Sequence, residues 1–520
     1  MKDPRQNELF DFYESFLSPV GYKRLSTSFY AVFRHVVLSL MPVEEISKHF
    51  NKSTGRSTKE LYSMAGLILL KEFKHWTTEE AAEAYMFDAR VQYALNLGRD
   101  NISLSERSLE RYMKLMREDD LASVVFDTVT SKLIDELDIQ IDSQRLDSTH
   151  IFSDMATFSR TKLMGVTIKR FLVQVKRHHQ NIYNDLAEEL RLRYEKNQNS
   201  LFADVSKDKA KRSSLRQDVA EEMYSLIQSF SGNKTIESMT TFKQLIEVFN
   251  QQCEVTENIK VDDNVENEKT DPKGKGEESS DNCNETKSTS VTVLKKTGGN
   301  VIQNPSDPNA TYDGHKGVGY QVQIAETSNS ENDVQLITSA LPQTAVESDA
   351  NAIELVINDL VGNGLLPNRM TADSLYGSDE NVLFCEEKNL SLISPVCGPT
   401  PLKELKEPTE KQLRLQQRRK EQETNEWREE YNSRAQIEGT IGAVKEKTSM
   451  VRLRYRGEQS MRCSIYLKIA GWNISRATAS AKMKKKIKKL IAQYKYSAKS
   501  KISFIHFEHR LAFYDVFKVV

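Results

Sequence analysis

Apolar side chains in the first 135 residues recur at the three- and four-residue spacing that is typical of amphipathic helices. The pattern is clearest at 29–41 and 60–73. Two capping boxes, Thr77 with Glu80 and Ser103 with Glu106, predict further helix starts. Residues 1–135 are therefore predicted to form an all-α N-terminal domain.

This helical domain has two interpretations. It is either a helical interaction domain or a helix-turn-helix bundle that binds DNA. In the second case a helix at 105–117 would lie against the duplex through its basic side chains, Arg107, Arg111, Lys114 and Arg117.

The pattern then changes to short alternating stretches. Ile139 and Ile141 alternate with polar residues, which predicts a strand ending near Asp147 and a polar turn at Ser148 and Thr149. Further elements are predicted downstream: strands at 320–324, 334–343, 369–372 and 390–395, and helices at 347–362 and from Ser378 or Asp379. Strands that alternate with helices indicate a mixed α/β domain.

About 150 residues separate the first predicted strand from the second. Residues 161–255 return to a charged helical pattern, which predicts a helical insertion. Residues 256–303 hold very few apolar side chains and are predicted to be a flexible acidic and polar linker. Such a segment buries too little apolar surface to offset its chain entropy.

Composition narrows the class of protein. The chain has 520 residues, 38% hydrophobic and 28% charged, as expected for a soluble multidomain protein. Its five cysteines form no CxxC pair, so we expect neither a disulfide framework nor a structural zinc site, and a reducing cytoplasm. The apolar run at 29–41 contains Arg34 and His35, and the N-terminus lacks an apolar signal region, so no membrane span is expected.

The net charge of −1 hides a segregation of charges along the chain. Residues 458–520 are predicted to be a basic C-terminal region, with nine lysines between 482 and 501 interleaved with Tyr494 and Tyr496. This region is either a surface for a phosphate backbone or a solubilising tail.

The richest chemistry lies in a predicted helix at 426–447. Tyr431, Arg434, Glu438 and Lys445 stand there at relative positions 0, 3, 7 and 14, which fall on one helical face. A carboxylate among a phenol and two cations suits a site where the carboxylate holds a metal and the cations hold phosphate oxygens. The alternative for Arg434 is an ion pair with Glu430 or Glu438.

The spacing of these four residues resembles the corresponding helix of bacterial insertion-sequence transposases of the DDE class. LDSTH at 146–150 and DSLYGS at 373–378 resemble the first and second catalytic motifs of that family, in the proper order. The phrases DPNA at 307–310 and HKGVGYQ at 315–321 are also similar to this group. The large insertion after the first strand departs from the layout of many relatives.

The resemblance implies an α/β RNase H-like catalytic domain, a mixed five-stranded sheet flanked by helices, built from residues 136–160 and 304–457. It implies that Asp147, Asp373 and Glu438 are the catalytic carboxylates; Asp142 and Asp154 are the alternatives to Asp147. The three would hold two Mg²⁺ or Mn²⁺ ions per active site. The chain would hydrolyse DNA at the ends of the element and transfer the freed 3′-hydroxyl to target DNA.

The resemblance also implies partners. Double-stranded DNA, as transposon ends and as target, would contact Tyr431, Arg434, Lys445, Lys316, Arg452 and Arg454, and the N-terminal domain would bind terminal inverted repeats. For Lys316, with Asp307 and His315, the alternative is a loop held by its own turns. A homodimer in a synaptic complex, in the bacterial cytoplasm and at the nucleoid when DNA-bound, is expected. Two other functions stay open: a catalytically inactive DNA-binding descendant, and an RNase H-like nuclease without strand transfer.

Overall fold

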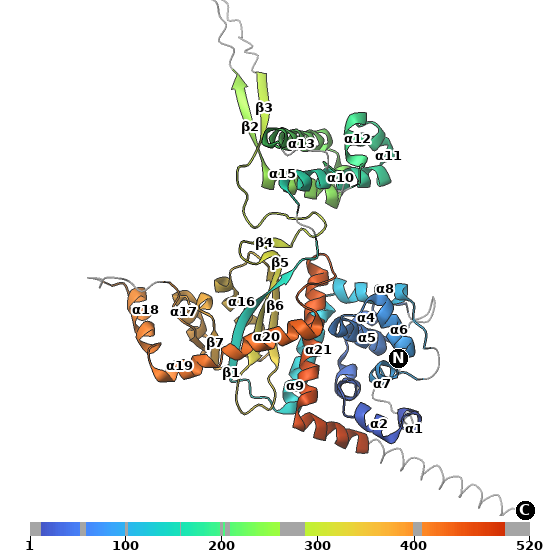
Figure 1. Ribbon diagram of the computed structural model, residues 1–520, viewed down its shortest axis with the longest axis vertical. Helices are drawn as coiled ribbons and strands as arrows, with labels where there is room; N and C mark the ends of the chain where they lie inside the picture. Colours follow the sequence, from blue (N-terminus) through green and yellow to red (C-terminus); the bar gives the residue numbers. More distant parts are fainter. Residues whose placement is uncertain are drawn as a thin grey trace, which may run out of the picture. The chain divides into compact units, whose positions relative to one another are not determined.

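The computed structural model describes residues 12–51, 59–98, 102–155, 158–197, 201–202, 208–260, 286–398 and 408–493 (Figure 1). The chain divides into two compact units, one formed by Met1–Asp154 with Gly319–Val520 and the other by Met155–Val318. In the described part of the chain no helix is both long and apolar enough to cross a membrane.

The N-terminal part of the first unit is helical, as predicted. Its elements are α1 (Phe12–Phe16), α2 (Pro19–Leu25), α3 (Phe29–Val32), η1 (Phe33–Val37), η2 (Leu38–Leu40), α4 (Val43–Ser47), α5 (Leu61–Lys74), α6 (Thr78–Phe87), α7 (Ala89–Ala94), α8 (Glu106–Glu118) and α9 (Leu121–Leu137). The capping box of Thr77 and Glu80 is confirmed. The one predicted at Ser103 is wrong, because Ser105 caps α8 by accepting from the Ser108 N–H.

A C-terminal helix, α21 (Glu458–Ala479), completes this helical core by packing against α5 and α9. It is buried along most of its length. Gly471 is required at the contact with α5, because a Cβ there would overlap the Phe73 ring. The basic stretch therefore begins after α21, in a further helical segment at 481–493; Tyr494 and Tyr496 lie outside the described residues.

The mixed sheet has six strands, one more than the five predicted. Its order is β4–β5–β1–β7–β8, and β6 also pairs with β5. The strands are β1 (Ser143–Phe152), β4 (Thr311–Asp313), β5 (Gly317–Thr327), β6 (Ile337–Thr344), β7 (Arg369–Ala372) and β8 (Ser391–Ile393). β5 is antiparallel to β1 and β6, whereas β7 is parallel to β1 and β8. Helices flank this sheet (Figure 1), an arrangement compatible with an α/β nuclease-like fold.

The helices between the strands are close to the predicted ones. After β6 come η3 (Asp349–Asn351) and α16 (Ala352–Gly362), and after β7 come η4 (Ser374–Tyr376) and α17 (Asp379–Glu387). β7 has the predicted bounds, and β8 is shorter than predicted.

β1 differs from its prediction, because it does not end near Asp147. Ser148 and Thr149, expected to form a polar turn, continue the strand and lie opposite Gln323 and Val322 of β5. The backbone of this polar segment pairs with β5 as far as Phe152. The polarity of the side chains alone does not predict this pairing.

The helix predicted at 426–447 is also interrupted. The structure has α18 (Glu410–Glu421), then α19 (Asn425–Asn432) and α20 (Ala435–Thr448), with Ser433 and Arg434 between the last two. The prediction of one continuous helix is wrong at these two residues.

The second unit has a hydrophobic core of its own, with Phe171, Phe230 and Phe242 in mutual contact. Its elements are α10 (Arg160–His178), α11 (Gln180–Asn184), α12 (Glu188–Glu195), α13 (Lys209–Phe230), α14 (Lys234–Glu237), α15 (Thr240–Gln252), β2 (Cys253–Lys260), β3 (Thr286–Val293) and β4 (Thr311–Asp313).

The linker predicted at 256–303 is wrong for residues 256–260 and 286–293. The first segment belongs to β2 and the second forms β3, which pairs with β2. Val291 and Val293 of β3 pack against the helical core. Two valines among serines and threonines are enough to attach a strand whose partner already lies on that core. Residues 261–285 of the predicted linker lie outside the described residues.

Candidate active site

The three predicted carboxylates gather around the guanidinium of Arg434. Its Nη2 lies 3.2 Å from Asp147 Oδ2 and 3.6 Å from Asp373 Oδ2, and its Nη1 lies 3.0 Å from Glu438 Oε1. The side chains of Asp147, Asp373 and Glu438 are 16%, 38% and 64% exposed, so the cluster opens to solvent on the Glu438 side. The alternative interpretation of Arg434, an ion pair with Glu438, is observed, and this ion pair belongs to a larger acidic cluster.

The register of two parallel strands brings the aspartates together. Leu146 of β1 lies opposite Ala372 of β7. The residues that follow these two, Asp147 and Asp373, therefore lie at neighbouring positions at the same end of the parallel strand pair.

Asp373 is held by the turn that it begins. Its Oδ1 accepts hydrogen bonds from the Ser374 hydroxyl at 2.9 Å and the Leu375 N–H at 3.3 Å, and its backbone carbonyl accepts from Ser394 Oγ at 2.5 Å. The hydroxyl of Ser394, just after β8, thus fixes the end of β7.

Arg418 of α18 braces the same turn from outside. Its guanidinium donates to the carbonyls of Gly377 and Ser394, each at 3.1 Å. Gly377 is needed at this contact, because a Cβ would overlap the carbonyl of Pro395. The DSLYGS segment is therefore a tightly packed support for the Asp373 carboxylate.

Burial and the positive charge of Arg434 shift the pKa values of its neighbours in opposite directions. Burial raises the pKa of Asp147 above its usual value, and the nearby Arg434 guanidinium offsets part of this shift. Burial also raises the pKa of Tyr431, again against the influence of Arg434. For Arg434 burial acts to lower the pKa, but the neighbouring acidic groups, Asp147 first, raise it overall.

The cluster fits a divalent metal in the chemistry of its donors. Carboxylate oxygens are the hard ligands that Mg²⁺ and Mn²⁺ prefer. Among the described residues no group of three acidic, histidine or cysteine side chains already surrounds a common metal position. Here the cation at the centre is Arg434, so the carboxylates converge on a positive charge that a metal would have to replace.

The remaining residues of the predicted helix face occupy both sides of the break. Tyr431, at the end of α19, stacks on Trp427 with ring centroids 4.9 Å apart. Lys445 lies in the last turn of α20, two turns beyond Glu438.

Arg452 and Arg454 follow α20 and are exposed. Arg452 lies opposite Phe152 in an isolated bridge, which carries this basic segment to the end of β1, and its Nη1 is 3.7 Å from Asp154 Oδ1. Lys316 belongs to the second unit, in a turn where Asp313 Oδ1 accepts from the N–H groups of His315 at 2.9 Å and Lys316 at 2.6 Å. These bonds are those of a loop held by its own turn.

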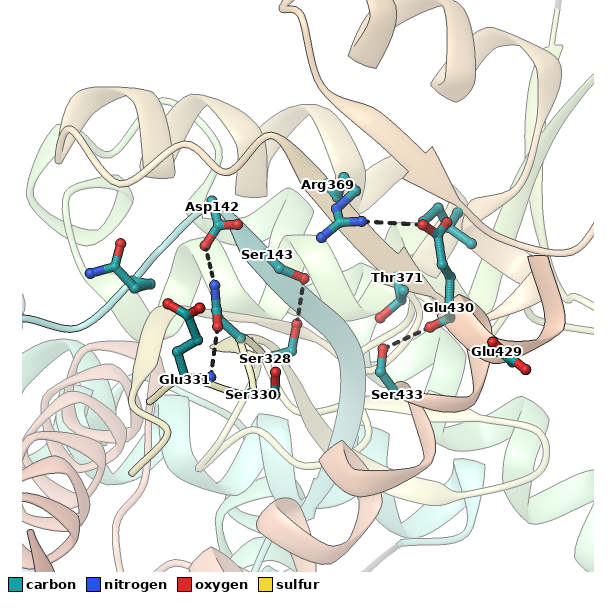
Figure 2. A pocket seen from close by; sticks show the side chains of 13 residues that line it. Asp142, Ser143, Ser328, Ser330, Glu331, Arg369, Thr371, Glu429, Glu430 and Ser433 are labelled. Atoms are coloured by element: carbon teal, nitrogen blue, oxygen red, sulfur yellow. Dashed lines mark hydrogen bonds and ion pairs between the residues drawn. The ribbon is translucent and has the colours of Figure 1, made fainter. Parts of the chain in front are cut away.

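A pocket of about 550 Å³ lies beside the end of α19 (Figure 2). Ser433 and Thr371 line it, together with Arg369, whose Nη1 is 3.2 Å from Glu430 Oε1. Asp147, Asp373 and Glu438 are not among its lining residues. The carboxylate cluster is therefore a feature separate from this pocket.

Sequence reasoning missed the buried supports of the cluster. Arg145 and Glu326 form an ion pair with side chains only 4% and 1% exposed, and Arg145 also contacts the α19–α20 junction. The only signal in the sequence was Arg145 itself, a charged residue two positions before Asp147. It did not identify Glu326, about 180 residues later, as its partner.

Comparison with known protein families gives a match to part of the chain. Residues 403–478 match the family described as Transposase DDE domain, a segment that contains α18, α19, α20 and nearly all of α21. The match confirms the predicted resemblance and supports a DDE transposase of an insertion sequence. No curated protein and no solved structure gives a significant match.

Proposed function

We propose that this protein is an insertion-sequence transposase that binds terminal inverted repeats. It would cleave and join DNA in an active site formed by Asp147, Asp373 and Glu438. One observation carries the proposal: three carboxylates from two strands and a helix, separated by more than 280 residues at the extremes, surround one guanidinium. A structural core has little use for such a semi-exposed acidic cluster at a strand end.

The arrangement of the sheet supports an RNase H-like catalytic domain. Three antiparallel strands followed by two parallel ones, in the order β6–β5–β1–β7–β8, are what that fold requires. Its first and fourth strands, β1 and β7, lie side by side. Asp147 lies within β1, Asp373 directly follows β7, and α20, after the fifth strand, supplies Glu438.

The chemistry follows from the donors. Asp147, Asp373 and Glu438 would hold a pair of Mg²⁺ or Mn²⁺ ions, which supply activation of a water or 3′-hydroxyl and stabilisation of the leaving oxygen at phosphorus. In the DNA-free chain the Arg434 guanidinium lies between these carboxylates and supplies a positive charge at the position of the metal ions. No covalent protein nucleophile is needed.

Cationic side chains near the cluster would hold the DNA. Arg434 and Lys445 would contact phosphates beside the scissile bond, and Tyr431 would contact a phosphate or a displaced base. Arg452 and Arg454 would extend this surface, and Lys316 of the second unit would also contact DNA. In the N-terminal part, Arg107, Arg111 and Lys114 of α8 are exposed and supply a further basic row. Joining two ends of one element suggests a homodimer.

The test is cleavage of a plasmid carrying the DNA that flanks the gene, with Mg²⁺ present. We expect nicked and then joined products, and none with Asp373→Ala. End binding without cleavage by the unmodified protein would mean an inactive descendant. Cleavage without joined products would mean a nuclease.

A further inference from the structure

We propose that Arg145, anchored by Glu326, is a positioning residue that sets the rotation of α20 and thereby brings Glu438 to the strand aspartates. This inference rests on the proposed function, because it assigns the geometry of the same site to a buried pair outside it.

The break between α19 and α20 leaves a backbone carbonyl available. The Ile437 N–H donates to the Arg434 carbonyl at 3.0 Å, three residues back, whereas a continuous α-helix would direct it to Ser433. The Ser433 N–H and the Arg434 N–H likewise make three-residue bonds, to Glu430 and Tyr431. The chain therefore tightens at this point, and the Ser433 carbonyl is free to accept from Arg145 Nη1 at 3.3 Å.

Arg145 uses all of its guanidinium nitrogens. Nε and Nη2 donate to Glu326 Oε2 at 2.8 and 2.5 Å, and Nη1 donates to Gln436 Oε1 at 2.7 Å. The other oxygen of Glu326, Oε1, accepts from the Thr440 hydroxyl at 3.0 Å. Arg145 and Glu326 lie directly opposite each other on β1 and β5, so the sheet itself fixes the pair.

Arg145 and Glu326 contact one flank of α20, and the carboxylate of Glu438 lies on the opposite flank. Ile437, Ile441 and Val444 form the buried ridge of α20. At about 100° per residue, Gln436 and Thr440 fall on one side of this ridge and Arg434 and Glu438 on the opposite side. Fixing the first flank at two positions one turn apart determines where Glu438 points.

The same pair also sets the height of α20 over the sheet. Arg145 and Asp147 are two residues apart on β1 and so project from the same face. Arg145 contacts the Gln436 flank, and Asp147 contacts Arg434 on the opposite flank. A buried ion pair gives little net stability, since desolvation offsets its attraction, but it defines a single geometry.

The test replaces the pair by apolar side chains of similar length, Arg145→Met with Glu326→Met, in the full-length protein. Such a replacement preserves folding in other buried pairs. We expect an unchanged melting temperature, an unchanged affinity for a duplex of flanking DNA, and cleavage reduced by about 10- to 100-fold, as for outer-shell metal supports. The Mn²⁺ concentration for half-maximal binding, followed by electron paramagnetic resonance, should rise by a similar factor.

Two further variants guard against misfolding. Gln436→Met removes one contact of Arg145 at an exposed position, and we expect a several-fold smaller shift in Mn²⁺ binding in the same direction. Arg193→Met breaks the ion pair with Glu222 in the second unit and should leave Mn²⁺ binding unchanged.

The outcomes separate the two claims. If Asp373→Asn weakens Mn²⁺ binding but both the double variant and Gln436→Met bind Mn²⁺ and cleave like the unmodified protein, the role of Arg145 is refuted and the catalytic site stands. If Asp373→Asn leaves Mn²⁺ binding and cleavage unaffected, the proposed catalytic site itself is wrong.

Discussion

Arg434 Nη2 lies 3.2 Å from Asp147 Oδ2, although 287 residues separate the two in the chain. The same guanidinium contacts Asp373 and Glu438. In the DNA-free protein one side chain therefore acts as the counter-cation of the whole carboxylate cluster. Any cation that binds the cluster must compete with it.

The first prediction concerns the carboxylates. Asp147→Asn, Asp373→Asn and Glu438→Gln each remove one metal-binding charge while keeping the side-chain shape. Cleavage of end-bearing DNA should fall by at least about 100-fold, more than for outer-shell partners, with DNA binding retained. Gel assays of cleavage and of DNA binding measure the two effects separately.

Asp154→Asn is the matched control for that series. Asp154 follows β1 and is 59% exposed beside Arg452, so its substitution should change cleavage little. A loss of cleavage in Asp154→Asn equal to that in Asp147→Asn would contradict the assignment of Asp147.

The second prediction concerns Arg434. Arg434→Gln removes the competing positive charge, so Mn²⁺ should bind the DNA-free protein about tenfold more tightly at pH 8. The free energy that corresponds to this factor is a modest part of the attraction between two charges about 4 Å apart. The same variant should bind end DNA more weakly, because a phosphate contact is lost. Calorimetric titration with Mn²⁺ tests the first effect; equal or weaker Mn²⁺ binding would show that Arg434 does not compete with the metal.

The third prediction concerns Lys445. If it contacts a phosphate, Lys445→Ala should reduce the slope of log K against log salt by about one, because one fewer counterion is released. Binding titrations between low and moderate salt measure this slope. Lys176→Ala, which removes an exposed lysine paired with Glu195, is the control and should leave the slope unchanged. An unchanged slope for Lys445→Ala would exclude it from the DNA surface.

The fourth prediction is a pH effect on stability at the α9–α16 contact. Burial, together with the nearby Asp359, raises the pKa of Asp127 to about 6. The ordinary value is about 3.9, so between about pH 4 and 6 the folded state holds more of this proton than the unfolded state does. The contribution of Asp127 to the free energy of unfolding therefore falls as pH rises through this window, and its cost is fully present above pH 6.

Asp127→Asn should remove that cost. Because the side chain is partly exposed, we expect a gain on the order of 1 kcal/mol at pH 7.5, and a smaller one at pH 5. Urea denaturation at the two pH values measures it. Asp138→Asn, at a carboxylate 84% exposed, should show neither gain. Equal gains for Asp127→Asn at both pH values would indicate a cause other than this proton.

Much of the site was predictable because its signals are local. Arg369–Ala372 and Asp373 were found from a short apolar stretch before a turn, and the matched helix from four residue types at fixed offsets. Alternation located the first strand only approximately, because Ile139 and Ile141 precede β1. Which strands are neighbours could not be predicted, because β1 and β7 are more than 200 residues apart and their pairing depends on the whole sheet.

The sequence by itself determined the helical N-terminal part, the strand and helix types of the sheet unit, and the resemblance carried by Tyr431, Arg434, Glu438 and Lys445. Tertiary structure alone decided three things: that β1 runs on through Ser148 and Thr149, that the helix breaks at Ser433, and that Arg145 pairs with Glu326 beneath it. The physical reason is the range of the interactions. Periodicity and capping act within a few residues, whereas strand pairing and buried ion pairs join residues that only the folded chain brings together.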